Sequence, residues 1–229
     1  MNAIVSEKKF IQERLGIPYQ NLSQSYLQAE TQLTNLSSYS FQLQRSQVST
    51  PNVTDQLLEL NDQFVITHFR IGLKYIDTAG NVGVPTAAEQ LAAQIYTYAD
   101  PTTFTSTSAA AASIFNSFLS FTIDRKDYLP QFPCNAFYRV PSTQTGAFLK
   151  TAGTVGTPAA TFTGNTGVNG YDNGLYGYYP SEPTLIDGRQ TLDLAINLGA
   201  AVTIATAGSD PYVAAIFQVR GYLVVNAKS

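Results

Sequence analysis

The chain has 229 residues, of which 44% are hydrophobic and 13% are charged, and its formal net charge at pH 7 is −3. Charged residues make up about 25% of an ordinary soluble domain, so the low content favours a protein whose surface is largely covered by neighbouring subunits. No basic run is longer than Lys8-Lys9, so a phosphate-contacting patch for nucleic acid is not expected. A single cysteine excludes an internal disulfide framework. No apolar run is long enough to predict a transmembrane helix.

Residues 1–51 are predicted to form an N-terminal assembly arm. A helix is expected from Ser6 to Leu15, because Ser6 can cap it and Gly16 and Pro18 end it. From Tyr19 to Leu36, apolar residues recur at steps of four and three, which predicts a second helix with one apolar stripe. Apolar and polar residues then alternate from Ser38 to Gln44, which predicts a strand.

The apolar stripe of this arm needs a partner surface. Its flanks carry Gln, Asn, Ser and Thr in place of the charges that solubilise a free coiled coil. We expect neighbouring copies of the chain to cover it, with packing on its own body as the alternative. Deletion of residues 1–50 is then expected to leave a folded body that assembles weakly. The arm residues expected at the subunit interface are Leu22, Tyr26, Leu33, Leu36, Phe41 and Leu43.

The body, residues 52–229, is predicted to be mainly strands. A short helix is expected from Val53 to Leu60, followed by a long alternating strand from Gln63 to Tyr75. A capped helix is expected from Thr86 to Tyr98, because Glu89 follows Thr86 by three residues. The other expected elements are a helical turn at Ala109–Ala112, a charged loop at Asp124–Pro133, and strands at Phe115–Ile123, Asn135–Val140, Thr191–Leu198, Val202–Ala205 and Val213–Val225.

A long loop rich in Gly, Asn and Tyr is predicted at about residues 142–184. A free loop of this composition would expose more apolar surface than a soluble monomer usually tolerates. We therefore expect its tyrosines to lie against another subunit or to fold back on the body, and they also offer stacking surfaces for sugar rings. The tyrosines in question are Tyr171, Tyr176, Tyr178 and Tyr179.

Seven or eight strands without a strand–helix alternation predict a mainly β protein. The expected fold is an antiparallel two-sheet sandwich, jelly-roll-like, with an N-terminal helical and extended arm. Long crossing loops and two very long strands favour the jelly roll over other sandwiches.

No catalytic, cofactor-binding or metal site is predicted. The single histidine, His68, lies in the long strand beside Arg70 and Lys74, a setting typical of a packed or solvent-edge side chain. The single cysteine, Cys134, fits no nucleophile pattern and is expected to be a buried structural thiol. One histidine and one cysteine do not supply an ordinary zinc or iron–sulfur site. We therefore expect no enzyme activity and no cofactor.

The arm that extends to Gln47, the strands at Phe64–Tyr75, Leu192–Leu198 and Ala215–Val225, and the Gly/Asn/Tyr loop give the chain a class resemblance. It resembles bacteriophage capsid proteins and other virion β-sandwich proteins. The resemblance implies self-assembly, a role in the particle shell or its attachments, and partners that are copies of the chain and other virion proteins.

The sequence shows no secretory signal, although its Tyr, Asn, Thr and Gly content is typical of exported surface proteins. A virion protein reconciles the two observations, because it is made in the host cytoplasm and leaves with the particle. An ordinary cytoplasmic domain of unusual composition is one alternative. Another is a cell-surface or carbohydrate-binding β-sandwich module that contacts glycans.

Overall fold

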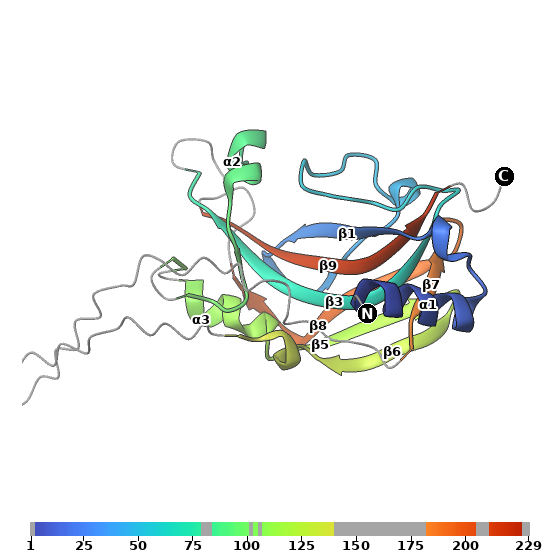
Figure 1. The fold of residues 1–229 in the computed structure, drawn as a ribbon. Helices are drawn as coiled ribbons and strands as arrows, with labels where there is room; N and C mark the ends of the chain where they lie inside the picture. Colours follow the sequence, from blue (N-terminus) through green and yellow to red (C-terminus); the bar gives the residue numbers. More distant parts are fainter. Residues whose placement is uncertain are drawn as a thin grey trace, which may run out of the picture.

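The computed structural model describes residues 3–78, 84–100, 103–104, 107–139, 182–204 and 211–225. A helix, α1 (Ala3–Leu15), and the 3-10 turn η1 (Tyr19–Asn21) lead into two stacked antiparallel sheets (Figure 1). One sheet contains β1 (Ser23–Gln32), β3 (Gln63–Ile76), β4 (Ile95–Tyr96), β7 (Thr184–Asp187) and β9 (Tyr212–Val224). The other contains β2 (Asn35–Ser40), β5 (Phe118–Ile123), β6 (Lys126–Pro133) and β8 (Leu192–Thr203). The short helices are η2 (Arg45–Gln47), α2 (Ala87–Ala92), α3 (Ser108–Ala111), η4 (Ala112–Ile114) and η5 (Cys134–Phe137).

The strand pairs are nested like those of one long hairpin. β1 pairs with β9, β2 with β8, β3 with β7 and β5 with β6, and every pair is antiparallel. The pairs β3–β9 and β5–β8 then join the rolled-up hairpin into two sheets, in the orders β1-β9-β3-β7 and β2-β8-β5-β6. This is the topology of an eight-stranded jelly roll, to which β4 adds a short strand beside β3. The predicted fold class is confirmed.

Because the strands are antiparallel, the loops and helices that connect them lie at the two ends of the sandwich. The helices α2 and α3 lie at one end, whereas α1 and the end of β9 lie at the other (Figure 1). The segment between η5 and β7 contains the predicted Gly/Asn/Tyr loop, and its residues 140–181 lie outside the described residues. No helix in the described part of the chain is long and apolar enough to cross a membrane.

The core lies between the sheets and is built from aromatic rings. The ring centroid of Phe69 on β3 lies 6.1 Å from that of Phe217 on β9 and 6.3 Å from that of Phe137. Phe41, which follows β2, lies 5.9 Å from Phe217. These contacts tie both sheets to η5, since aromatic pairs at such separations add specific attraction to the burial of their area.

A β-bulge in β3 reverses which of its alternating side chains point toward the core. A single alternation along this strand would place Val65 and Phe69 on the same face, but they lie on opposite faces. The register with β9 shifts between Ile66 and His68, so Thr67 is an extra residue and the alternation reverses there. Consequently Val65 packs with α1 on the outer face. The residues of β3 that face the core are Phe64 and Ile66 before the bulge and Phe69, Ile71 and Leu73 after it.

The segment predicted as an arm supplies an edge strand to each sheet. Its first helix is confirmed, since α1 includes Ser6 to Leu15. The second helix, predicted from Tyr19 to Leu36, is wrong, because most of this stretch forms β1. Pairing with β9 overrides the helical spacing, and it places Leu27 and Ala29 in the core. Deletion of residues 1–50 would therefore remove β1 and β2, so we no longer expect it to leave an intact body.

Three further local predictions are wrong. Val53–Leu60 is not helical but crosses beside β1 and is held by isolated bridges. The predicted loop Asp124–Pro133 is mostly strand β6, because the turn needs only Asp124 and Arg125, both with positive φ. The predicted strand Asn135–Val140 begins instead with the 3-10 turn η5.

The boundaries of other elements moved. The strand predicted at Ser38–Gln44 runs from Asn35 to Ser40. The helix predicted from Thr86 has the expected capping box with Glu89, but it ends at Ala92 and is followed by β4. The strands predicted at Thr191–Leu198 and Val202–Ala205 form one strand, β8, whereas the predicted closing strand agrees with β9.

Candidate functional site

A polar pocket of about 420 Å³ opens on the outer face of the five-stranded sheet, beside α1. The adjacent strands β1, β9 and β3 form its floor. Its lining is rich in amide and hydroxyl groups and contains two charged side chains. The lining residues are Glu7, Gln24, Ser25, Tyr26, Thr67, His68, Gln218, Arg220, Gly221 and Tyr222.

The sheet register brings these side chains together from distant parts of the sequence. Arg220 on β9 is paired with Tyr26 on one side and His68 on the other. The bulge at Thr67 lets two successive residues of β3 line the pocket, and the Thr67 hydroxyl lies 2.7 Å from Nδ1 of His68. The bulge also explains Gly221, because a Cβ there would lie 1.8 Å from the carbonyl oxygen of Val65.

Gln218 is the buried polar group of the pocket. Its side chain is only 8% exposed. Its Nε2 donates to Oε1 of Gln28 at 3.1 Å, and Gln28 in turn donates to the carbonyl of Thr54. The Oε1 atom of Gln218, by contrast, has no hydrogen-bond partner. A buried acceptor without a partner costs free energy, so this atom is suited to accept a hydrogen bond from a ligand or water.

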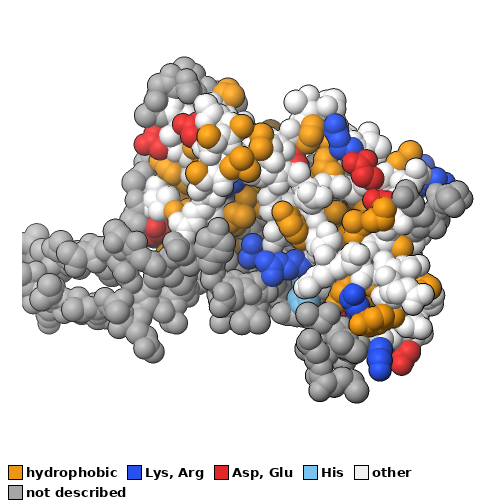
Figure 2. Space-filling view, turned by 45° about the horizontal axis from the view of Figure 1, so that its top comes forward, with side chains coloured by type: hydrophobic (Ala, Val, Ile, Leu, Met, Phe, Trp, Pro, Cys, Tyr) orange, Lys and Arg blue, Asp and Glu red, His pale blue; other side chains and the backbone are white. Residues whose placement is uncertain are grey.

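The charges of the pocket are arranged unevenly. The Tyr222 hydroxyl donates to the Glu7 carboxylate at 2.8 Å, and burial, followed by this bond, raises the pKa of Tyr222 well above its usual value. Burial also lowers the pKa of His68; the charge of Glu7 opposes this shift and that of Arg220 adds to it. In the described ranges no carboxylate lies within 4.0 Å of the exposed Arg220 guanidinium. On the face in Figure 2, Lys and Arg side chains lie beside the histidine.

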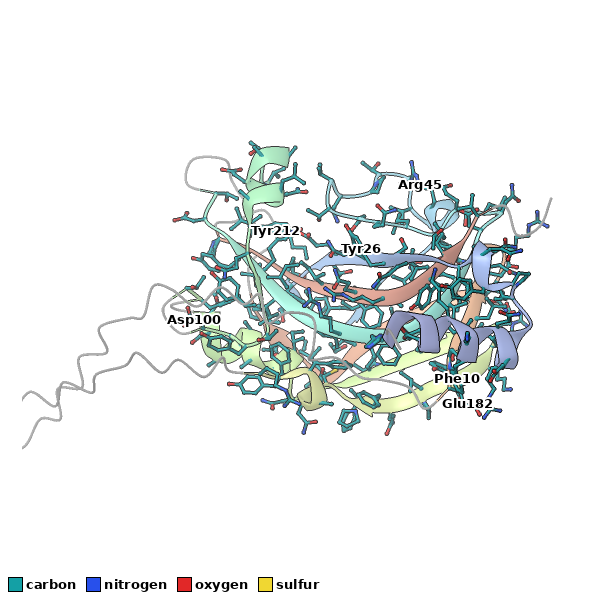
Figure 3. All side chains as sticks on the ribbon, in the orientation of Figure 1. Phe10, Tyr26, Arg45, Asp100, Glu182 and Tyr212 are labelled. Atoms are coloured by element: carbon teal, nitrogen blue, oxygen red, sulfur yellow. The ribbon has the colours of Figure 1, made fainter. Side chains whose placement is uncertain are left out.

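A buried ion pair lies beside the pocket on the same outer face. Lys74 of β3 contacts the carboxylate of Glu30 of β1, and both side chains are almost fully buried. The hydroxyls of Tyr212 and Thr54 each donate to Glu30 at 2.9 Å. Asp55 accepts the backbone N–H of Glu30 at 3.0 Å. The network, which includes Tyr212 (labelled in Figure 3), therefore holds the segment before β3 against β1.

On the outer face of the four-stranded sheet, the three adjacent strands β2, β8 and β5 carry little charge, whereas the edge strand β6 begins with Lys126 and Asp127. Asp193 is the one charged residue of β2, β5 and β8. The Ser38 hydroxyl donates to Asn197, which donates to the Ser120 hydroxyl at 3.1 Å. We call the surface of these three strands the uncharged face; its neutral outward side chains are Leu36, Ser38, Ser40, Phe118, Ser120, Thr122, Ala195 and Asn197, and Asp193 lies at its border beside Thr122.

The predicted interface residues fall into three groups. Tyr26 lies in the pocket and is 45% exposed (labelled in Figure 3), and Leu36 lies on the uncharged face and is 51% exposed. Four others are buried within this chain, so they present no surface to a neighbour: Leu22, Leu33, Phe41 and Leu43. The remaining four lie outside the described residues: Tyr171, Tyr176, Tyr178 and Tyr179.

Sequence reasoning missed Gln218 and Arg220 as site residues. The alternation of side chains along β9 could have identified them. Phe217 and Val219 point into the core, so Gln218 and Arg220 between and after them point outward. The partners on β1 and β3 could not be found in the same way, because the register across the bulge is a tertiary property.

Cys134 is expected to be unreactive in the folded protein. The side chain is buried, and desolvation raises its pKa to about 11 although a hydrogen bond with Ser117 opposes the shift. At pH 8 roughly one thiol in a thousand would then be ionised, and the thiolate is the reactive form. Labelling with a disulfide reagent should be slow before denaturation and rapid after it. Equal labelling rates in both states would contradict the buried placement.

His68 and Cys134 remain predicted to have no catalytic or metal-binding role. Within the described part of the chain, no group of three or more His, Cys, Asp and Glu residues is placed to hold a metal ion. No protein-family model, curated protein or solved structure matches the chain.

Proposed function

We propose that this chain is a virion structural protein, a capsid or capsid-associated subunit that assembles with copies of itself and with other virion proteins. The jelly roll is an architecture of viral capsid domains and also of lectins. Because one fold serves many functions, the proposal depends on a surface feature. The observation that carries it is the uncharged face of the four-stranded sheet.

The uncharged face has the composition of an interface. Interface cores are depleted of charged residues and enriched in aromatic ones, because a buried charge loses hydration that a neighbour seldom replaces fully. Here three adjacent strands carry small neutral side chains, together with Leu36 and Phe118, which is 49% exposed. A second subunit could cover this surface without desolvating a charge other than that of Asp193.

The two edges of the four-stranded sheet support the same proposal. Edge strands are usually protected from further pairing by charges or prolines. Strand β6 has Lys126, Pro130 and Pro133, whereas β2 contains neither a charged residue nor a proline. Among the strands that the structure describes, β2 pairs only with β8, so its other edge offers backbone groups to a neighbouring chain.

Size-exclusion chromatography of matched variants tests this proposal. Ser120→Arg places a charge at the centre of the uncharged face, and Ser49→Arg adds the same charge at an exposed position outside it. We expect the unmodified chain and Ser49→Arg to elute as concentration-dependent oligomers, and Ser120→Arg to elute as a folded monomer by circular dichroism. Identical elution of the unmodified chain and Ser120→Arg would contradict the interface.

A second candidate function, a carbohydrate-binding module, is favoured by the polar pocket. Lectins share the jelly roll, and the pocket combines amides, hydroxyls and an exposed tyrosine. The two functions differ in a simple observable. A shell subunit associates with itself, whereas a binding module of this kind can remain a monomer and still bind sugar.

A further inference from the structure

We infer that the pocket on the outer face of the five-stranded sheet binds a carbohydrate that carries a carboxylate, such as a uronic or sialic acid unit of a glycan. The inference rests on the second candidate function and is independent of self-assembly. Three features of the pocket lead to it: a buried acceptor without a partner, an exposed cation and an exposed aromatic ring.

The acceptor is Oε1 of Gln218, and it indicates a ligand that donates hydrogen bonds. The other end of this amide is held by Gln28, so the acceptor cannot turn away without breaking that contact. Sugars present many hydroxyl donors, and one of them would satisfy the Oε1 atom. A site that hydrogen-bonds a hydroxyl also discriminates against ligands that lack it.

The cation is Arg220, and it indicates that the ligand is acidic. A guanidinium presents a planar fork of donors that matches a carboxylate. The carboxylate of Glu7 in the same pocket already accepts from Tyr222. Arg220 is the one Lys or Arg side chain of the lining, and a ligand carboxylate is the group that best complements it.

The aromatic ring is that of Tyr26, the cross-strand partner of Arg220. An exposed ring can pack against the apolar C–H face of a sugar. Gln24 and Ser25 lie on the same strand and add amide and hydroxyl groups to the lining. The carboxylate and the ring of one acidic sugar can thus contact neighbouring side chains in a single row of the sheet.

Ligand-observed NMR titration of the full chain tests the inference. The probes are sodium glucuronate, N-acetylneuraminic acid, glucose and inorganic phosphate. We expect the two acidic sugars to bind, glucose to bind about tenfold more weakly or worse, and phosphate to bind no better than glucose, because a charge-assisted bond and hydroxyl contacts are both needed. Equal binding of glucose and glucuronate would overturn the acidic assignment, and phosphate equal to glucuronate would overturn the sugar assignment.

Variants place the binding in this pocket. Arg220→Gln and Gln218→Met should each weaken glucuronate binding about tenfold, whereas Arg125→Gln, at the exposed turn between β5 and β6, should leave it unchanged. Unchanged binding in a folded Arg220→Gln variant would overturn the inference. No binding of any sugar would overturn the second candidate function as well, and binding confined to glucose would overturn the acidic assignment alone.

Discussion

Replacement of Phe217 with alanine is expected to lower the free energy of unfolding by about 3–5 kcal/mol. The Phe217 ring is 1% exposed and lies between those of Phe41 and Phe69. Its removal leaves a cavity where the two sheets meet, and the surrounding rings can relax only in part. Equilibrium denaturation with urea or guanidinium measures the change.

The matched control is Val225→Ala, directly after the same strand. Val225 is 58% exposed, so the control should change the unfolding free energy by less than about 0.5 kcal/mol. A cost near zero for Phe217→Ala would show that β9 is peripheral, and the jelly-roll assignment would then lose its central strand.

Replacement of Lys74 with methionine is expected to destabilise the protein by about 3–5 kcal/mol, because it leaves the Glu30 carboxylate buried without its cation. The two hydroxyl donors, Tyr212 and Thr54, would remain. They cannot supply a full charge, so the segment before β3 should loosen over β1. The same denaturation measurement gives the cost.

A double-mutant cycle separates the ion pair from simple loss of packing. Adding Glu30→Gln to Lys74→Met removes the unpaired charge and keeps an acceptor for the two hydroxyls. The double variant should be more stable than the sum of the single costs implies, by at least about 1 kcal/mol. Strict additivity would mean that Lys74 and Glu30 do not act as a pair.

The sequence predicted elements well wherever one face of a long strand is apolar. The alternation from Gln63 and that from Val213 correspond to β3 and β9, and the Thr86–Glu89 capping box was also correct. Prediction from the sequence was wrong where pairing between strands decides the conformation. Ser23–Gln32 shows helical spacing yet pairs along its whole length with β9, and the bulge at Thr67 leaves no mark in the residue pattern.

The candidate surfaces were harder to predict for a related reason. Of the apolar residues expected at an interface, Leu36 is 51% exposed, whereas Leu22 and Leu33 are covered by the chain itself. Whether an apolar residue is covered depends on which strand lies over it. Likewise, Arg220 and Gln218 become a site only when β1 and β3 flank β9, a relation that joins residues almost two hundred positions apart.

Negative-stain electron microscopy of the purified, concentrated chain tests the central claim of self-assembly most directly. The proposal predicts regular assemblies built from a repeating subunit, which the Ser120→Arg variant fails to form and the Ser49→Arg variant forms normally. A field of separate single-subunit particles for the unmodified chain, at concentrations where it remains folded, would contradict the proposal that the chain forms a shell by itself.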